Sequence, residues 1–260
     1  MTPVTKLDLR THRYEDMIPL SRLRELSVAI IGVGGIGRPL ALALAVMGVG
    51  SLILVDDGEI EEVNLGTQGW LPKDIGSPKV QALMKEIREL NPECIVEDVR
   101  QRFEDRPVWP GLTPVVVSCL DSISTRADLW KVVQADPGVL LFVDGRMGGW
   151  TVRVLAWQRG LPWDYGTTLF PEEEAEELPC TAKSTVHVGS LAATLGVGAI
   201  TRWLNRQPPV HDMVFDMATG VCVDLTSYNK ETPDGERPAA VVAATDGTRG
   251  EAAQGELDQE

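Results

Sequence analysis

The sequence predicts an α/β fold in which a Rossmann-like, doubly wound, mostly parallel sheet carries helices on both faces and ends in an antiparallel hairpin extension. Short runs rich in β-branched residues alternate with segments of helical periodicity. A glycine-rich turn joins the first of these runs to the first long helical segment. Strands that alternate with helices favour parallel pairing, and such sheets bind ligands beyond the carboxyl ends of their strands.

The expected elements follow one another in a regular order. Residues 27–33 (SVAIIGV) and 51–56 (SLILVD) form buried-strand runs, and residues 35–48 between them place apolar side chains at helical spacing, which makes a βαβ unit. The elements expected after this unit are helix 77–92, strand 114–120, helix 124–134, strands 139–145 and 151–157, helix 185–206 and a hairpin at 213–226 around an Ala-Thr-Gly turn.

Length and charge restrict the classes of protein and partner. A chain of 260 residues that is 43% hydrophobic can bury one substantial core. The net charge of −14 disfavours nucleic acid and anionic membrane surfaces as partners, because binding there depends on Lys and Arg. The sequence has neither an apolar run of membrane-spanning length nor the apolar core of a signal peptide, so we expect a cytoplasmic protein.

Acidic residues are concentrated in two segments. Residues 229–260 hold eight acidic and three basic residues and no aromatic residue, which predicts a disordered acidic tail. Residues 171–178 (PEEEAEEL) contain five glutamates, which predicts a solvated, mobile loop. The rest of the chain, 1–228, is expected to be a single domain.

The glycine-rich turn predicts a nucleotide site. Residues 32–37 read G-x-G-G-x-G at the end of a strand and the start of a helix, where exposed amides and the helix dipole favour phosphate. Asp56 closes the next strand, 19 residues after Gly37, where a carboxylate can accept from both hydroxyls of a ribose. Taken alone, this fingerprint fits an NAD-dependent dehydrogenase.

A longer series of motifs along the chain indicates a different class of enzyme. In order they are Arg13-Tyr14, the glycine loop, Asn64-Leu65-x-x-Gln68, Gly76-x-x-Lys79, Leu90-Asn91-Pro92 and Asp121-x-x-x-Thr125-Arg126. This series resembles the ThiF/MoeB superfamily of ubiquitin-activating-type adenylyltransferases. A hydride-transfer site of a dehydrogenase does not require these motifs. The chain also lacks a convincing catalytic His or Tyr-x-x-x-Lys arrangement.

The resemblance implies ATP and Mg²⁺ as cofactors, a small ubiquitin-like or sulfur-carrier protein with a C-terminal glycine as partner, and a homodimer. It places the nucleotide-binding half at about 20–145 and an acidic crossover loop at about 158–180. The residues that it assigns to the nucleotide are Gly32, Gly34, Gly35, Gly37, Asp56, Asn64, Gln68, Lys79, Asp121 and Ser122.

The resemblance also implies individual roles. Gly35 approaches the phosphates, and Asn64 and Gln68 line the phosphate side. Lys79 supplies positive charge to the phosphates, and Asp121 binds Mg²⁺, because charge builds on the phosphoryl oxygens when a carboxylate displaces pyrophosphate. The structural alternatives are a surface lysine at Lys79, a turn residue at Asn64 and a helix-capping acid at Asp121.

Two arginines of the family pattern are missing. Asp16 stands where the pattern R-Y-x-R-Q has its second arginine, and Thr67 stands where N-L-x-R-Q has its arginine. Arg38, Arg22 or Arg24 could replace them, and Arg38 follows the glycine loop directly. Without such a replacement, the chain is a weakened or non-catalytic scaffold.

The four cysteines form no C-x-x-C pair, so we expect no structural zinc. Leu178-Pro179-Cys180-Thr181 resembles the motif around the thioester-forming cysteine of ubiquitin-activating enzymes. Cys180 is therefore the candidate acceptor thiol. Lys183 nearby favours its thiolate and the upstream glutamates oppose it. The alternatives are a structural cysteine, and an enzyme that activates a peptide or a tRNA-linked carboxylate without a covalent intermediate. His187 is expected on a helix face.

Overall fold

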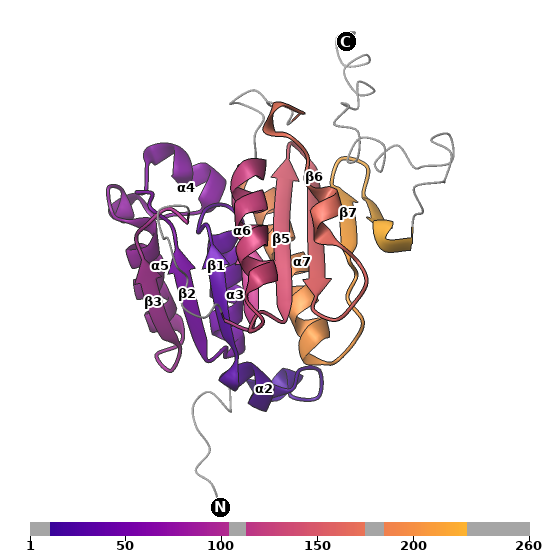
Figure 1. Cartoon of the computed structure of the whole chain (residues 1–260). Coiled ribbons are helices and arrows are strands. Elements are labelled where there is room, and N and C mark those ends of the chain that lie inside the picture. Colours follow the sequence, from indigo (N-terminus) through magenta and orange to yellow (C-terminus); the bar gives the residue numbers. More distant parts are fainter. Residues whose placement is uncertain (1–10, 104–112, 175–184, 228–260) are drawn as a thin grey trace, which may run out of the picture.

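An eight-stranded sheet in the order β3-β2-β1-β4-β5-β6-β7-β8 runs through the molecule (Figure 1). The structure is a computed structural model, and it describes residues 11–103, 113–174 and 185–227. The parallel strands are β1 (Ser27–Ile31), β2 (Ser51–Val55), β3 (Ile95–Val99), β4 (Val115–Ser118) and β5 (Leu141–Gly148).

The order of the parallel strands reverses at β1. The chain runs outward from β1 through β2 to β3, and then crosses to the other side of β1 to form β4 and β5. The carboxyl ends of β1 and β4 therefore flank a topological switch point, which is the place where open α/β sheets bind ligands.

Three antiparallel strands extend the sheet beyond β5. They are β6 (Thr151–Gln158), β7 (Asp212–Asp216) and β8 (Val221–Asp224). A tight turn at Gly149 and Trp150 connects β5 to β6, and Gly149 has a φ of 55°. The turn between β7 and β8 includes Gly220, with a φ of 72°, where the sequence predicts a hairpin.

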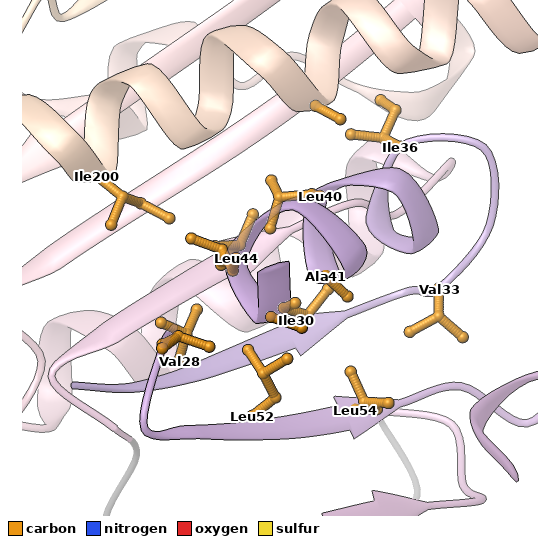
Figure 2. Close-up of a cluster of buried hydrophobic side chains, with 14 of the residues drawn as sticks. Val28, Ile30, Val33, Ile36, Leu40, Ala41, Leu44, Leu52, Leu54 and Ile200 are labelled. Carbon is orange, nitrogen blue, oxygen red and sulfur yellow. The ribbon is translucent and has the colours of Figure 1, made fainter. Parts of the chain in front are cut away.

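Helices cover both faces of the sheet. One face carries α3 (Gly37–Met47), α5 (Lys79–Leu90) and α7 (Val186–Leu204), and the opposite face carries α6 (Ile123–Ala135). Val28 and Ile30 of β1 lie in the cluster that contains Leu40 and Leu44 of α3 and Ile200 of α7 (Figure 2).

The other face of β1 packs against different partners. Ala29 and Ile31 lie in a second cluster with Leu129 and Trp130 of α6. Successive side chains of a strand point to opposite faces, so each buried strand contributes to both cores. None of the helices in the described segments is both long enough and apolar enough to cross a bilayer.

Local signals set the helix ends. Gly48 ends α3 in the left-handed region with a φ of 94°, the usual glycine stop. The Asn91-Pro92 pair follows the last turn of α5, and the Ser122 hydroxyl caps α6 by accepting from the Thr125 amide. The short elements are η1 (His12–Tyr14), α2 (Leu20–Glu25), α4 (Glu62–Gln68), η2 (Pro72–Asp74), η3 (Tyr165–Thr168), η4 (Glu172–Glu174) and η6 (Leu225–Ser227).

The predicted fold class is confirmed, including the mostly parallel sheet and the antiparallel C-terminal strands. The sequence did not reveal β3, an edge strand whose first residue, Ile95, is 73% exposed. Its exposed positions weaken the apolar run that marks the central strands. The predicted tail at 229–260 lies outside the described residues, and of the acidic loop at 171–178 only the first four residues are described.

Candidate nucleotide-binding site

The glycine loop joins β1 to α3 at the switch point, and two of its glycines are required by the fold. Gly32 has a φ of 90°, and a Cβ there would lie 2.6 Å from the carbonyl oxygen of Cys119. A Cβ at Gly37 would lie 1.9 Å from the carbonyl oxygen of Gly32. A side chain at either position would push apart backbone segments that the sheet and α3 hold together.

Gly34 and Gly35 differ, because no backbone atom would lie within 3.4 Å of a Cβ at either position. A Cβ at Gly34 would lie 3.6 Å from the side-chain amide nitrogen (Nε2) of Gln68, which is an ordinary van der Waals contact. A Cβ at Gly35 would lie 3.0 Å from the terminal methyl of Met147, which can rotate away. Neither residue has a positive φ, and both are partly exposed. Backbone crowding therefore does not require glycine at these two positions, which present a backbone that a ligand could approach closely.

Asp56, which directly follows β2, is bound to the glycine loop. Its Oδ2 accepts from the Val33 amide at 2.9 Å, and its Oδ1 accepts from the Gly58 amide at 2.8 Å. The carboxylate is thereby fixed beside the loop. Each carboxylate oxygen can accept more than one hydrogen bond, so Asp56 still has acceptor capacity for hydroxyls of a ligand.

Lys79 begins α5 on the other side of Gly58. Its amide donates to the carbonyl oxygen of Gly58 at 3.0 Å. A Cβ at Gly58 would lie 3.2 Å from the Lys79 Nζ and 2.9 Å from the Asp56 Oδ1, so the small residue lets both groups lie close together. The structure thus places Asp56 and Lys79 at the same edge of the sheet as the glycine loop.

The α4 helix covers the loop from one side. Asn64 takes part in a capping box, in which its Oδ1 accepts from the Glu61 amide at 3.0 Å while the Glu61 side chain accepts from the Asn64 amide. Gln68, at the other end of α4, accepts from the Trp70 indole at 2.9 Å, and its side-chain amide faces Gly34. Gln68 is therefore next to the loop, and Asn64 orders the start of α4.

Arg38 follows the loop, but its guanidinium group has other partners. Its Nη2 donates to both carboxylate oxygens of Glu86, at 2.9 and 2.8 Å, and its Nη1 donates to the carbonyl oxygen of Gln68 at 3.4 Å. The guanidinium carbon lies 4.8 Å from the centre of the Trp70 ring. Only 12% of the Arg38 side chain is exposed. In this conformation Arg38 braces α4 against α3 and α5.

Arg22 and Arg24 lie at the opposite edge of the sheet. Both belong to α2, which precedes the amino end of β1 and lies far from α4 in Figure 1. Arg22 donates to the carbonyl oxygen of Leu204 at the end of α7, and Arg24 donates to the Thr11 hydroxyl at 3.4 Å. The structure does not bring these arginines to the glycine loop of their own chain.

Asp121 and Ser122 follow β4, next to the carboxyl end of β1. The side-chain cap of α6 is Ser122, and Asp121 is exposed beside it. Glu172 reaches the same helix end, where its Oε2 accepts from the Ser124 amide at 2.7 Å and from the Ser122 hydroxyl at 3.1 Å. The hydrogen bond from the Ser124 amide is the main cause that lowers the pKa of Glu172.

A buried cluster next to this helix end was not predicted from the sequence. Asp144 of β5 has no exposed side-chain surface and pairs with Arg126 at 3.0 Å and with Arg146 at 2.6 Å. The Tyr165 hydroxyl donates to the same carboxylate at 2.9 Å. We refer to these four residues as the Asp144 cluster. The only signal in the sequence is an Asp-Gly-Arg interruption of an apolar strand run, where charged residues are rarely buried without a partner.

The cluster perturbs the pKa of its members. Burial acts to raise the pKa of Asp144, but the Arg126 and Arg146 guanidinium groups outweigh it and hold the pKa at about 2. Burial, followed by the Asp144 charge, raises the pKa of Tyr165 above its usual range. Asp144 is therefore an anion and Tyr165 a neutral donor at physiological pH.

The candidate thiol, Cys180, and the neighbouring Lys183 lie outside the described residues. His187, in the first turn of α7, contacts the Thr185 hydroxyl at 2.9 Å, and its ring centre lies 5.6 Å from that of Trp150. This exposed position agrees with the expectation of a histidine on a helix face.

Similarity to known proteins identifies the family. The ThiF family model matches residues 8–215. The sulfur carrier protein ThiS adenylyltransferase of Escherichia coli K12 is 30% identical over 180 residues, which cover 67% of this chain and 69% of that protein. The chain belongs to the ThiF family. This confirms the family prediction and, with it, the prediction of a ThiF-type adenylyltransferase.

Other relatives of this ThiF-family chain differ in what they act on. The tRNA threonylcarbamoyladenosine dehydratase of Bacillus subtilis is 41% identical over 121 residues, which cover 43% of this chain and 46% of that protein. Among solved structures, Escherichia coli MccB with ATP superposes with a TM-score of 0.71 at 18% identity, over 85% of this chain and 70% of MccB. At that identity, the likeness to MccB supports the fold alone.

Proposed function

We propose that this ThiF-family protein uses ATP and Mg²⁺ to adenylate the C-terminal glycine carboxylate of a small ubiquitin-like or sulfur-carrier protein. One observation carries the proposal. Gly34 and Gly35 lack side chains that the fold would accommodate, and they lie at the switch point beside Asp56 and Lys79. This is the arrangement expected where a chain wraps its backbone around phosphates.

The residues present fit ATP. The partly exposed backbone of Gly34 and Gly35 gives the phosphates close access to amides at the start of α3. Asp56 offers acceptors to ribose hydroxyls, and the Lys79 ammonium group supplies a positive charge beside it. Gln68, whose side-chain amide faces Gly34, adds a donor on the phosphate side.

The residues also fit Mg²⁺. This ion is usually held by one or two carboxylates together with substrate phosphates and waters, not by a full protein cage. Asp121 supplies one exposed carboxylate at the correct edge of the sheet, and Ser122 supplies a hydroxyl next to it. Within the described segments no group of three or more His, Cys, Asp or Glu residues could hold a metal ion, so the nucleotide would have to complete the coordination.

The chemistry follows from these groups. When bound, ATP and Mg²⁺ supply an electrophilic phosphorus and a metal that balances charge on the phosphoryl oxygens. Lys79 would stabilise the same charge as pyrophosphate leaves, and the loop amides would hold the phosphates in line with the attacking carboxylate. Asp56 would fix the ribose and so prevent the nucleotide from sliding along the loop.

Relatives favour a protein substrate, and one of them supports a second candidate. The relative that aligns over two thirds of this chain is named for a sulfur carrier protein, which supports a carrier protein as substrate. The relative with 41% identity is named for a tRNA nucleoside, which supports tRNA as the carrier of the activated carboxylate in the second candidate. For the first candidate we further propose that Cys180 accepts the acyl group, and that the protein works as a homodimer.

The test is ATP–pyrophosphate exchange in the presence of Mg²⁺. We expect exchange that depends on a small protein ending in glycine and that disappears when this glycine is removed. Exchange that requires tRNA would favour the second candidate. ATP binding without exchange in either case would indicate a non-catalytic scaffold, consistent with the missing arginines at Asp16 and Thr67.

Cys180→Ala separates the two chemical routes. If Cys180 forms a thioester, the variant keeps carrier-dependent exchange but loses the carrier adduct that thiols can release from the wild-type protein. Cys222→Ala, which changes an exposed cysteine on β8, is the matched control and should keep the adduct. Full turnover of Cys180→Ala would contradict the thioester proposal and leave the adenylation proposal intact.

A further inference from the structure

The Asp144 cluster fixes the backbone that carries Asp121. Arg126, which pairs with Asp144, also donates through Nη2 to the carbonyl oxygens of Leu120 and Gly145, the latter at 3.3 Å. Leu120 directly precedes Asp121. Arg126 therefore ties the backbone just before Asp121 to the middle of β5.

The same carboxylate holds a second segment that returns to Asp121 from the other side. Arg146, the other partner of Asp144, donates to the Thr168 carbonyl oxygen at 2.9 Å and to the Thr168 hydroxyl at 3.0 Å. It also donates to the Tyr165 hydroxyl at 3.1 Å. These bonds fasten η3 to β5.

The segment after η3 closes a ring around Asp121. Four residues beyond Thr168, Glu172 accepts from the Ser124 amide and the Ser122 hydroxyl at the start of α6. The ring thus runs from Asp144 through Arg126 to Leu120 on one side. On the other side it runs through Arg146, η3 and Glu172 to Ser122. Asp121 lies between Leu120 and Ser122, the two residues at which the arms of the ring end.

The charges make Asp144 the centre of this ring. Arg126 and Arg146 are almost fully buried, with 8% and 13% of their side chains exposed, and Asp144 lies between them. Two buried guanidinium groups repel each other unless an anion separates them. Loss of the Asp144 charge would therefore disturb both arms of the ring while the surrounding apolar core stays in place.

We propose that Asp144 is a positioning residue for Mg²⁺: through Arg126 and Arg146 it holds Asp121 where the metal must be bound. This inference rests on the proposed function. Mg²⁺ requires nearly ideal octahedral geometry, so a displaced carboxylate loses affinity for it. Residues that orient a metal ligand typically change metal affinity by about 10- to 100-fold when they are replaced.

The experiment measures ATP binding to the full-length protein by calorimetry, first in EDTA and then across a Mg²⁺ titration. Asp144→Asn should raise the Mg²⁺ concentration for half-maximal enhancement of ATP binding by about tenfold. Its affinity for ATP in EDTA should stay within about twofold of wild type, because the glycine loop and Asp56 are not part of the ring. Asp121→Ala should abolish the Mg²⁺ enhancement.

The matched control is Asp212→Asn. Asp212 pairs with Arg153 through two hydrogen bonds, at 2.8 and 2.7 Å, and is also nearly buried. This pair joins β6 to β7 and does not belong to the ring. Asp212→Asn should lower the melting temperature and leave the Mg²⁺ midpoint unchanged, which separates loss of stability from loss of positioning.

A milder variant covers the case in which Asp144→Asn fails to fold. Tyr165→Phe removes the hydroxyl that donates to Asp144 and accepts from Arg146 but removes no charge, and it should raise the Mg²⁺ midpoint by about threefold. A wild-type Mg²⁺ midpoint in every ring variant that folds would overturn the inference while leaving the proposed function standing. ATP binding by the wild-type protein that does not respond to Mg²⁺ would overturn both.

Discussion

The two sides of the nucleotide edge are built in different ways. On the β1–β2 side, the groups that face the proposed ligand are backbone amides and the side chains of Asp56 and Lys79. On the β4–β5 side, Asp121 and the adjacent Ser122 are held by buried ion pairs and by capping hydrogen bonds at the start of α6. The contrast indicates that one side obtains its precision from the backbone itself and the other from a network of charged side chains.

The glycines on the first side offer the largest contrast. Gly37→Ala should lower the free energy of unfolding by about 3 kcal/mol, because the new Cβ overlaps the carbonyl oxygen of Gly32. Gly34→Ala should hardly change the melting temperature, since its Cβ meets only ordinary contacts, but should weaken ATP binding by about tenfold, about 1.4 kcal/mol. Urea unfolding and calorimetry measure the two quantities. Equal effects of both variants on stability would contradict the division between fold and ligand.

Lys79 tests whether the side chains on the first side act on the chemistry. Lys79→Ala should slow carrier-dependent pyrophosphate exchange by about 100-fold, because one cation at the developing charge is lost. Stability should change little, since the side chain is partly exposed. Lys131→Ala is the control, because Lys131 forms only a surface pair with Asp128. Unchanged exchange in Lys79→Ala would restore the interpretation of Lys79 as an ordinary surface lysine.

The Asp144 cluster should make the stability of the second side depend on pH in acid. The pKa of the Asp144 carboxyl group lies at about 2, below the ordinary value of 3.8. A lowered pKa stabilises the folded state at all pH values above about 4, and this contribution disappears as the pH falls towards 2. The difference in unfolding free energy between wild type and Asp144→Asn should therefore shrink by about 2 kcal/mol over this range. Urea titrations from pH 6 downward measure it, and a constant difference would contradict the assignment of an ionised Asp144.

The first side was accessible from the sequence because its features are local. The glycine spacing and the acid at the end of the next strand are each defined within a few residues of a recognisable element, and the family resemblance added Lys79 through the short Gly-x-x-Lys motif. Parallel pairing then brings those strand ends to one edge without further information. Local periodicity likewise predicted the long helices and every strand except the edge strand β3.

On the second side the sequence indicated Asp121 and Ser122, but not the Asp144 cluster that holds them, because the contacts of that cluster are distant in sequence. Arg126, Asp144 and Tyr165 are separated by 18 and 21 residues, and they meet only when α6 and η3 pack on the same face of β5. No periodicity marks such pairs. The partner of Arg38 is equally hidden, since Glu86 is 48 residues away, on α5.

Arg38 is on the glycine-loop side but is held by a side-chain ion pair, as on the second side. Changes to this pair should have the smallest effect on ATP affinity. It follows the loop directly, which predicts a role at the phosphates, yet it is paired with Glu86. If Arg38 turns towards the phosphates when ATP binds, Glu86 competes with the nucleotide for the same guanidinium group. Glu86→Gln should then strengthen ATP binding by about two- to threefold, while the partly exposed pair contributes less than about 1 kcal/mol to stability.

The matched comparison is Arg38→Lys. A lysine cannot bind both oxygens of Glu86 in parallel and stack on Trp70 at the same time, so this variant tests the bracing of α4. If Arg38 only braces α4, both variants should weaken ATP binding, because Gln68 shifts relative to Gly34 when its carbonyl partner is loosened. Opposite effects of Glu86→Gln and Arg38→Lys on the dissociation constant for ATP would instead assign Arg38 to the nucleotide. It would then replace one of the two missing arginines, and the backbone-built side of the site would gain a mobile cation.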